Sequence, residues 1–171
     1  PHWRASRLPQ TPQAMTASAR LAALGLTLPQ VATPVGTYTP ARRIGDLVYT
    51  SGQLPLVDGE LVATGVVGQR AGDVGTERAA QCARAAVLNA LAAVVSVTDG
   101  IDSVLGIVKM TGFVASAPGF TGQPAVLNAA SGILADVFGE QGRHARSAVG
   151  VAALPLGAPV EIELIAQLRP L

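Results

Sequence analysis

The amino-acid sequence predicts one α+β domain in which two helices pack on one face of a single mixed β-sheet. The chain of 171 residues is long enough for one core and too short for two independent enzymatic domains. Its periodic segments follow one another as strands, helix, strand, helix and strands. This order is typical of a two-layer fold with the helices on one side of the sheet.

The first element is a short helix within an amino-terminal extension, which we place at residues 1–33, ahead of a single domain at residues 34–171. Thr16 to Gly25 contains leucines and alanines between a small-residue start and a glycine stop, a pattern typical of a short helix. Residues 1–14 precede Met15 and are interpreted as an upstream extension or an expression remnant. A secretory signal is disfavoured because an arginine adjoins the apolar stretch and no convincing cleavage site follows.

The next elements are strands. Tyr38 to Arg43 and Leu47 to Gly52 flank Gly45-Asp46, and this arrangement is the signal of a β-hairpin. Asp58-Gly59 marks a second tight turn. The first third of the domain is therefore predicted to be a meander of strands.

Two amphipathic helices follow. Glu77 to Val95 carries apolar residues at helical spacing, and Thr76 is placed to cap its start. Pro124 suits the first turn of the second helix, which continues through Phe138 and ends at the glycines that follow.

The remaining segments predict three strands. Asp102 to Ser116 is rich in Val, Ile, Gly and Phe and apolar on both faces, so we interpret it as a central strand. Ala145 to Leu154 and Val160 to Leu168 are the closing strands, and a turn at Leu156 to Ala158 would join them as a hairpin.

Composition limits the class of protein. Charged residues make up 13% of the chain, against about 25% in an average globular domain, which suggests that other subunits bury part of the surface. No apolar run reaches the roughly 18 residues of a membrane helix, so we expect a soluble oligomer without a membrane partner. One lysine, scattered arginines and 4% aromatic residues argue against a nucleic-acid partner. A lone cysteine, Cys82, indicates a reducing, cytoplasmic setting and no zinc site.

Arg146 is the first candidate for chemistry. Alternation places it on one strand face beside Ala148 and Gly150, where small side chains leave room for a ligand or for close packing. A guanidinium binds a carboxylate through two parallel hydrogen bonds and stays charged when buried. The alternative is a structural salt bridge to a core glutamate.

Glu161 and Glu163 share a face of the last strand, where burial would raise a carboxyl pKa toward that of a general acid or base. The alternative is a solvated edge face. In a simple hairpin, Arg146 would lie roughly 23 Å from Glu161, so the two either do not cooperate or meet across a subunit boundary. His144 is either a proton carrier or a plain surface residue, and no metal-ligand set is present in the sequence.

Several motifs resemble, in order, the signatures of the YjgF/YER057c/UK114 family, also called the Rid (reactive intermediate deaminase) family. The resemblance covers roughly residues 34–167. The motifs are Gly36-Thr37-Tyr38, Val48 to Pro55, Val108 to Met110, Asn128, Ala145 to Val149, and Val160 to Glu163.

The resemblance implies a chorismate-mutase-like fold, a homotrimer with clefts between subunits, and hydrolysis of 2-aminoacrylate and related 2-imino acids to 2-oxo acids and ammonia without a cofactor. It implies that Arg146 clamps the carboxylate of a small substrate and that Glu161 positions or protonates the attacking water. The implied lining of the cleft is Tyr38, Ser51, the Gly52 backbone, Asn128 and Ala148.

The sequence also departs from the family pattern, which indicates a divergent branch. Ala148 stands where many members have a cysteine, so a backbone N–H is kept and the thiol is lost. The segment before the second predicted helix is also longer, which suggests a reshaped cleft. The rival functions are a trimeric binder of small carboxylates and, with less support, an endoribonuclease or translation inhibitor.

Overall fold

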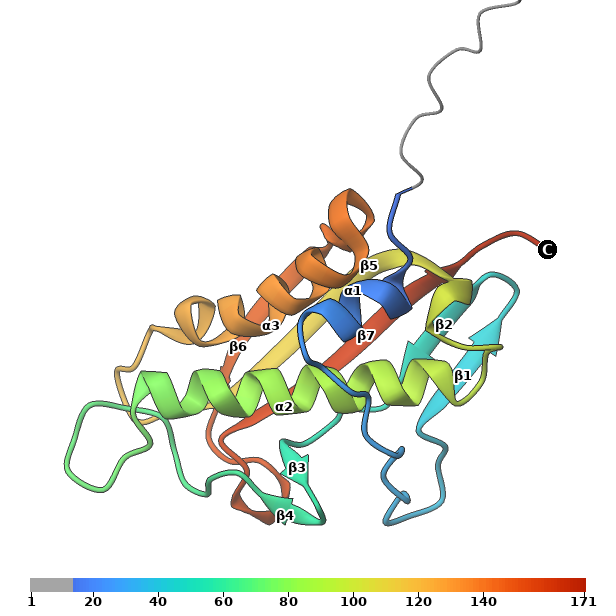
Figure 1. Cartoon of the computed structure of the whole chain (residues 1–171). Helices are drawn as coiled ribbons and strands as arrows, with labels where there is room; N and C mark the ends of the chain where they lie inside the picture. Colours follow the sequence, from blue (N-terminus) through green and yellow to red (C-terminus); the bar gives the residue numbers. More distant parts are fainter. Residues whose placement is uncertain (1–13) are drawn as a thin grey trace, which may run out of the picture.

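A computed structural model describes residues 14–171 and contains a five-stranded sheet with three helices (Figure 1). The first part of the predicted extension, through residue 13, lies outside the described residues. The helices are α1 (Ala17–Ala23), α2 (Thr76–Val95) and α3 (Gln123–Phe138), and the strands are β1 (Ala41–Ile44), β2 (Leu47–Thr50), β3 (Leu56–Val57), β4 (Glu60–Leu61), β5 (Val104–Ala115), β6 (Ala145–Val151) and β7 (Val160–Leu168).

The sheet has the strand order β1-β2-β7-β5-β6, and β3 and β4 form a separate two-stranded ribbon. Strand β5 pairs antiparallel with β7 on one side and parallel with β6 on the other. The prediction of a central strand at residues 102–116 is therefore confirmed. The predicted β6–β7 hairpin is wrong because β5, apolar on both faces, takes the interior position between them.

The turns between the early strands agree with the sequence prediction. Gly45 has a φ of 57° between β1 and β2, and Asp58 and Gly59 have φ values of 51° and 82° between β3 and β4. These left-handed conformations are the ones that two-residue hairpin turns require. Both predicted turns are thereby confirmed. The predicted meander is wrong as a continuous sheet, because β2 pairs next with β7 while β3 and β4 form their own ribbon.

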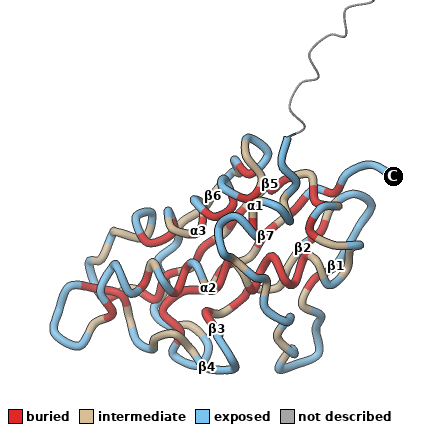
Figure 2. The backbone as a smooth tube through the Cα atoms, viewed as in Figure 1, coloured by how far each residue is buried: buried red, intermediate tan, exposed pale blue. Residues whose placement is uncertain are grey.

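The helices cover one face of the sheet. In Figure 1, α2 and α3 lie side by side in front of the strands, and the short α1 packs against α3. Alanines at helical spacing in α2 are fully buried, and their small side chains let the α2 backbone lie close to the elements packed against it. Figure 2 shows buried residues along α2 and along the strands that it covers. None of the helices in the described part of the chain is long and apolar enough to cross a membrane.

The helix ends differ in one respect from the prediction. Thr16 caps α1 by accepting a hydrogen bond from the Ala19 amide, as its sequence position suggests. Thr76, by contrast, is the first residue of α2 rather than its cap, and the capping position is held by Gly75 without a side-chain hydrogen bond. The expected cap fails because the helix begins one residue earlier than the pattern indicated.

The second face of the sheet carries no helix in the described part of the chain. Alternation along β5 buries Met110, Gly112 and Val114 under the helices, so Thr111 and Phe113 point to the other side and are half-buried. Tyr49 and Val149 belong to the same uncovered face and are 43% and 37% exposed. We call this surface the open sheet face. This face carries partly exposed apolar side chains beside charged ones, Lys109, Glu161 and Glu163, and its cover by neighbouring subunits stays a prediction.

Candidate functional site

Arg146 lies on β6, on the helix-covered side of the sheet. It is paired with Met110 of β5, which is fully buried under the helices, and paired residues share a face. Its side chain reaches α3, where Nη1 donates to Asn128 Oδ1 at 2.9 Å and to Ser131 Oγ at 3.2 Å. The structure thus brings together two predicted site residues, Arg146 and Asn128.

The guanidinium of Arg146 is held in place without a carboxylate partner. Ion pairs within residues 14–171 join Arg70 to Asp73 and Arg143 to Glu140, and none involves Arg146. The alternative of a salt bridge to a core glutamate is therefore wrong for the described part of the chain. In that same part, Nε and Nη2 of Arg146 have no hydrogen-bond partner. The Nε–Nη2 edge of the guanidinium can therefore bind a carboxylate through two parallel hydrogen bonds.

Two further residues complete the site: Ser131, which the sequence analysis did not single out, and His144, which it considered as a proton carrier. Ser131 Oγ lies 3.0 Å from His144 Nε2, and His144 Nδ1 lies 2.7 Å from the Gly142 carbonyl oxygen. The histidine is half-buried between α3 and β6, so it is not a plain surface residue. The signal was present in the spacing, because His144 shares the face of Arg146 and Ser131 follows Asn128 by one helical turn.

These residues line a cavity of about 360 Å³ at the edge of the domain, which we call the Arg146 pocket. Ala148 continues along the same face of β6 and is half-buried against the core opposite Gly112. Its contact with the substrate stays a prediction. The lining residues of the pocket are Asn128, Ser131, Ala135, Gly142, Arg143, His144 and Arg146.

Glu161 lies on β7 and belongs to the open sheet face, where it is half-buried and paired with Phe113. Burial first, and then the neighbouring charge of Glu163, raises the pKa of Glu161 above its ordinary value of 4.5. Its carboxylate lies against Gly52, where any added Cβ would overlap it. A larger residue at position 52 would therefore displace the Glu161 carboxylate from its present position.

Two other predicted lining residues, Ser51 and Tyr38, lie beside Gly52, which itself contacts Glu161. Ser51 donates its hydroxyl to the Thr39 carbonyl oxygen at 2.6 Å, so this hydroxyl already holds the preceding loop. Tyr38 is 55% exposed and lines, with Gly52 and residues 32–35, a small cavity of about 100 Å³. Tyr38, Ser51, Gly52 and Glu161 thus form a second group, which we call the Glu161 group.

The Arg146 pocket and the Glu161 group do not meet within one chain. Arg146 pairs with Met110 of β5 and Glu161 pairs with Phe113 of the same strand, so the two lie two strands apart and are offset by three residues along the strands. This separation places their Cα atoms about 14 Å from each other. The offset of three residues also puts the side chains on opposite faces. The separation of roughly 23 Å inferred from a hairpin is wrong, because β5 lies between the two strands.

The stability of the chain should depend on pH through Glu161. A raised pKa means that the folded state holds this proton more tightly, so the free energy of unfolding falls as pH rises from about 4.5 through the folded-state pKa. Glu161→Gln removes this loss. We expect its stability gain over the wild type to be near zero below about pH 4 and to grow toward neutral pH.

Urea denaturation of both chains at a series of pH values measures this difference. Glu60→Gln, on the exposed β4, corrects for the loss of one negative charge. A stability difference between Glu161→Gln and the wild type that stays constant with pH would contradict the assigned burial.

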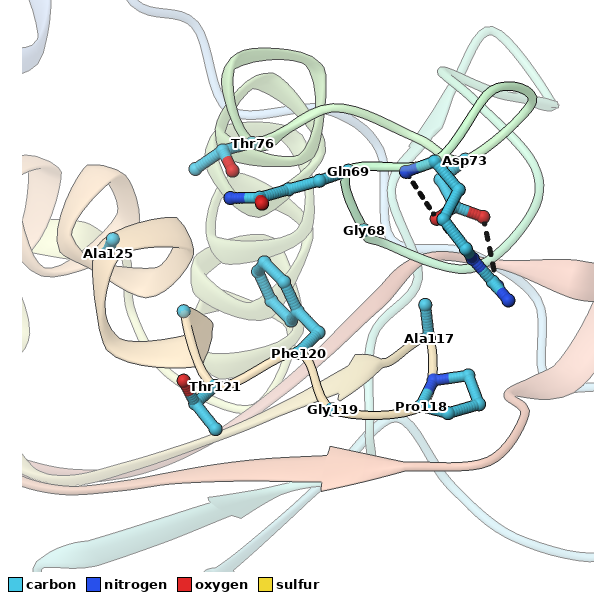
Figure 3. A pocket seen from close by; sticks show the side chains of 12 residues that line it. Gly68, Gln69, Asp73, Thr76, Ala117, Pro118, Gly119, Phe120, Thr121 and Ala125 are labelled. Carbon is cyan, nitrogen blue, oxygen red and sulfur yellow. Dashed lines mark hydrogen bonds and ion pairs between the residues drawn. The ribbon is translucent and has the colours of Figure 1, made fainter.

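A cavity larger than the Arg146 pocket lies elsewhere in the described part of the chain. A space of about 490 Å³ opens between the loop at residues 68–73, the loop at residues 117–122 and the starts of α2 and α3. In Figure 3, Phe120 points into this space toward Gln69, while Asp73 is turned toward Arg70, whose hydrogen bonds lower the pKa of the Asp73 carboxyl. The longer segment noted in the sequence therefore shapes this cavity and not the Arg146 pocket.

Metal binding has no visible basis in the described residues. Within residues 14–171, no three His, Cys, Asp or Glu side chains gather closely enough to hold an ion. Cys82 is fully buried in α2, and burial raises the pKa of its thiol, as expected for a core residue.

Comparison with known proteins gives a consistent family. Residues 18–168 match the model of the family described as "YjgF/chorismate mutase-like, putative endoribonuclease". The chain is 39% identical over 160 residues to "Protein TCP17" of Trypanosoma cruzi, and the match covers 91% of this chain and 98% of that protein.

Solved structures agree with this match. A protein of Shewanella oneidensis described as a putative endoribonuclease is similar with a TM-score of 0.84 and 32% identity, covering 90% of this chain and all of that one. Escherichia coli TdcF with bound serine is similar with a TM-score of 0.57 and 27% identity, covering 82% of this chain and 94% of TdcF.

Proposed function

This chain belongs to the YjgF/chorismate-mutase-like family, and on that premise we propose that it hydrolyses small 2-imino acids to 2-oxo acids and ammonia in a cleft between subunits. One observation carries the proposal. Arg146 is anchored through Nη1 to Asn128 and Ser131, has no acidic partner within residues 14–171, and keeps its Nε–Nη2 edge for a carboxylate.

The substrate class follows from the size and charge of the Arg146 pocket. A cavity of about 360 Å³ suits a small molecule, and guanidinium selects a planar anion. TdcF, a family relative, is known with bound serine, which is itself a small carboxylate. A 2-imino acid has the same carboxylate next to the carbon that water must attack.

The general acid–base of the reaction is assigned to Glu161. In the proposed reaction, water adds across the C=N bond, and the resulting carbinolamine collapses to a 2-oxo acid and ammonia as a proton moves to the nitrogen. Because its pKa is raised, the Glu161 carboxylate is a stronger base than an ordinary carboxylate, so it can take a proton from water and return it to the nitrogen. Glu161 therefore serves as the relay for both proton transfers.

The proposed site requires two subunits. Arg146 and Glu161 of one chain face opposite sides of the sheet, so they can act on one substrate only if the Arg146 pocket of one subunit adjoins the Glu161 group of the next. A homotrimer closed by rotation would generate three such clefts. The apolar side chains of the open sheet face support burial in such an assembly.

The first experiment measures release of ammonia and 2-oxo acid from freshly generated imino acids, with sedimentation velocity on the same sample. We expect turnover above the spontaneous rate and a trimer. A trimer that binds 2-oxo acids without turnover would indicate a carboxylate-binding protein instead. A stable monomer would overturn the intersubunit cleft, and RNA cleavage without imine turnover would support the endoribonuclease description of the family.

A further inference from the structure

The Arg146 pocket contains a second set of reactive groups that the imine reaction does not use. We propose that Ser131 and His144 act as a nucleophile and its general base, giving the protein an esterase activity toward half-esters of short dicarboxylic acids. The inference goes beyond the proposed function and depends neither on Glu161 nor on a second subunit.

The polarity of the hydrogen-bond chain is determined by its two ends. The Gly142 carbonyl oxygen can only accept, so His144 Nδ1 carries the proton, and in the neutral ring Nε2 is then an acceptor. Ser131 Oγ must therefore donate its proton to Nε2 at 3.0 Å. At the other end of the chain of hydrogen bonds, the Arg146 guanidinium can only donate, so its Nη1 donates to a lone pair of Ser131 Oγ.

This polarity is the one that a serine nucleophile needs. The hydroxyl proton points to a base, the base is oriented by a third group, and a positive charge lies 3.2 Å from the oxygen that would become negative. Both side chains are half-buried and line the pocket, so a ligand in the pocket can reach the hydroxyl. The arrangement thus has the geometry of an activated hydroxyl.

The remaining donors of the pocket define the substrate. The free Nε–Nη2 edge of Arg146 binds a carboxylate, while Asn128, whose Oδ1 accepts from Arg146, keeps its Nδ2 hydrogens for an oxyanion. Because Ser131 Oγ is only 3.2 Å from Arg146 Nη1, the carboxylate and the acyl carbon must be a few bonds apart. Half-esters of succinate-sized dicarboxylic acids have this spacing.

The reaction follows a balanced two-step course. Ser131 Oγ attacks the ester carbonyl carbon as its proton passes to His144 Nε2, and the tetrahedral oxyanion faces Asn128 Nδ2. The C–O bond to the alcohol breaks, and His144 returns the proton to the departing oxygen, which leaves an acyl-serine. Water, deprotonated by His144, then releases the dicarboxylic acid and restores the hydroxyl.

The test uses mono-p-nitrophenyl succinate, with p-nitrophenyl acetate as the probe that lacks a carboxylate. We expect release of p-nitrophenolate, at least about 10-fold preference for the succinate ester, and a succinyl group on Ser131 by peptide mass spectrometry after acid quench. Ser131→Ala should abolish the label and lower the rate at least about 100-fold, and His144→Gln should slow acylation to a similar extent.

The control is Ser96→Ala, since the Ser96 hydroxyl also donates a hydrogen bond, to the Ala93 carbonyl oxygen, but this exposed residue caps the end of α2 and does not line the pocket. It should react like the wild type. Ser131→Ala is expected to fold, because alanine favours a helix interior, and circular dichroism checks this. The proposal is overturned if the wild type gains no succinyl group, if the label maps to another residue, or if Ser131→Ala is acylated as fast as the wild type.

Discussion

Replacing Arg146 by alanine is expected to lower kcat/KM for 2-imino acids by about 10²- to 10³-fold, because the substrate carboxylate loses a bidentate, charge-assisted partner in a partly buried pocket. Arg146→Lys should recover only part of this loss. Lysine keeps the charge, but it cannot hold Asn128 and Ser131 with one nitrogen and present a planar fork with the others. Steady-state kinetics of ammonia release measures both variants.

The matched control for Arg146 is Arg84→Ala. Arg84 is an exposed residue of α2, remote from the Arg146 pocket, and its loss also removes one positive charge. The control separates local binding from a general change in net charge, which is +1 for the whole chain. Equal kcat/KM values for Arg146→Ala and Arg84→Ala would show that Arg146 does not bind the substrate carboxylate.

Mixing two inactive variants is expected to restore about a quarter of the wild-type activity. In a randomly mixed trimer of Arg146→Ala and Glu161→Gln chains, a cleft built from two subunits receives an intact Arg146 from one chain and an intact Glu161 from the other with a probability of about one in four. A site within one chain would never be restored, since every chain lacks one of the two groups.

The measurement is ammonia release after the two variants are unfolded together and refolded, with each variant refolded alone as the control. Refolding of the wild type alone calibrates the yield. The mixture must first be shown to contain both chains in one assembly. If it then releases ammonia no faster than the separately refolded variants, a cleft shared between subunits is contradicted. The result is independent of the Ser131 experiment, which needs one chain only.

Much of the secondary structure could be predicted because it depends on close neighbours in the sequence. The alanine and leucine spacing of α2, the proline in the first turn of α3 and the glycine turns between early strands each act over a few residues. Strand alternation and side-chain chemistry singled out Arg146 and Glu161, the family motifs supported both, and Asn128 followed from the family motifs alone. The cap of α2 failed at the same local level, since a helix end is easily displaced by one residue.

The arrangement of the candidate site could not be predicted in the same way. A turn between β6 and β7 looks locally like a hairpin, but the insertion of β5 depends on packing between segments tens of residues apart. The Ser131–His144 contact likewise spans 13 residues and exists only because α3 lies against β6.

The sequence by itself determined the class of fold and the approximate positions of the helices and of the longer strands. It also determined the face of its own strand to which Arg146 or Glu161 points, because periodicity is a local property of the backbone. Only the tertiary structure decided that Arg146 and Glu161 lie on opposite faces of the sheet and that Arg146 is held by α3 instead of by a glutamate. The order of the strands and the contacts between side chains of different elements depend on how the whole chain buries its apolar surface. This property cannot be inferred from any one segment.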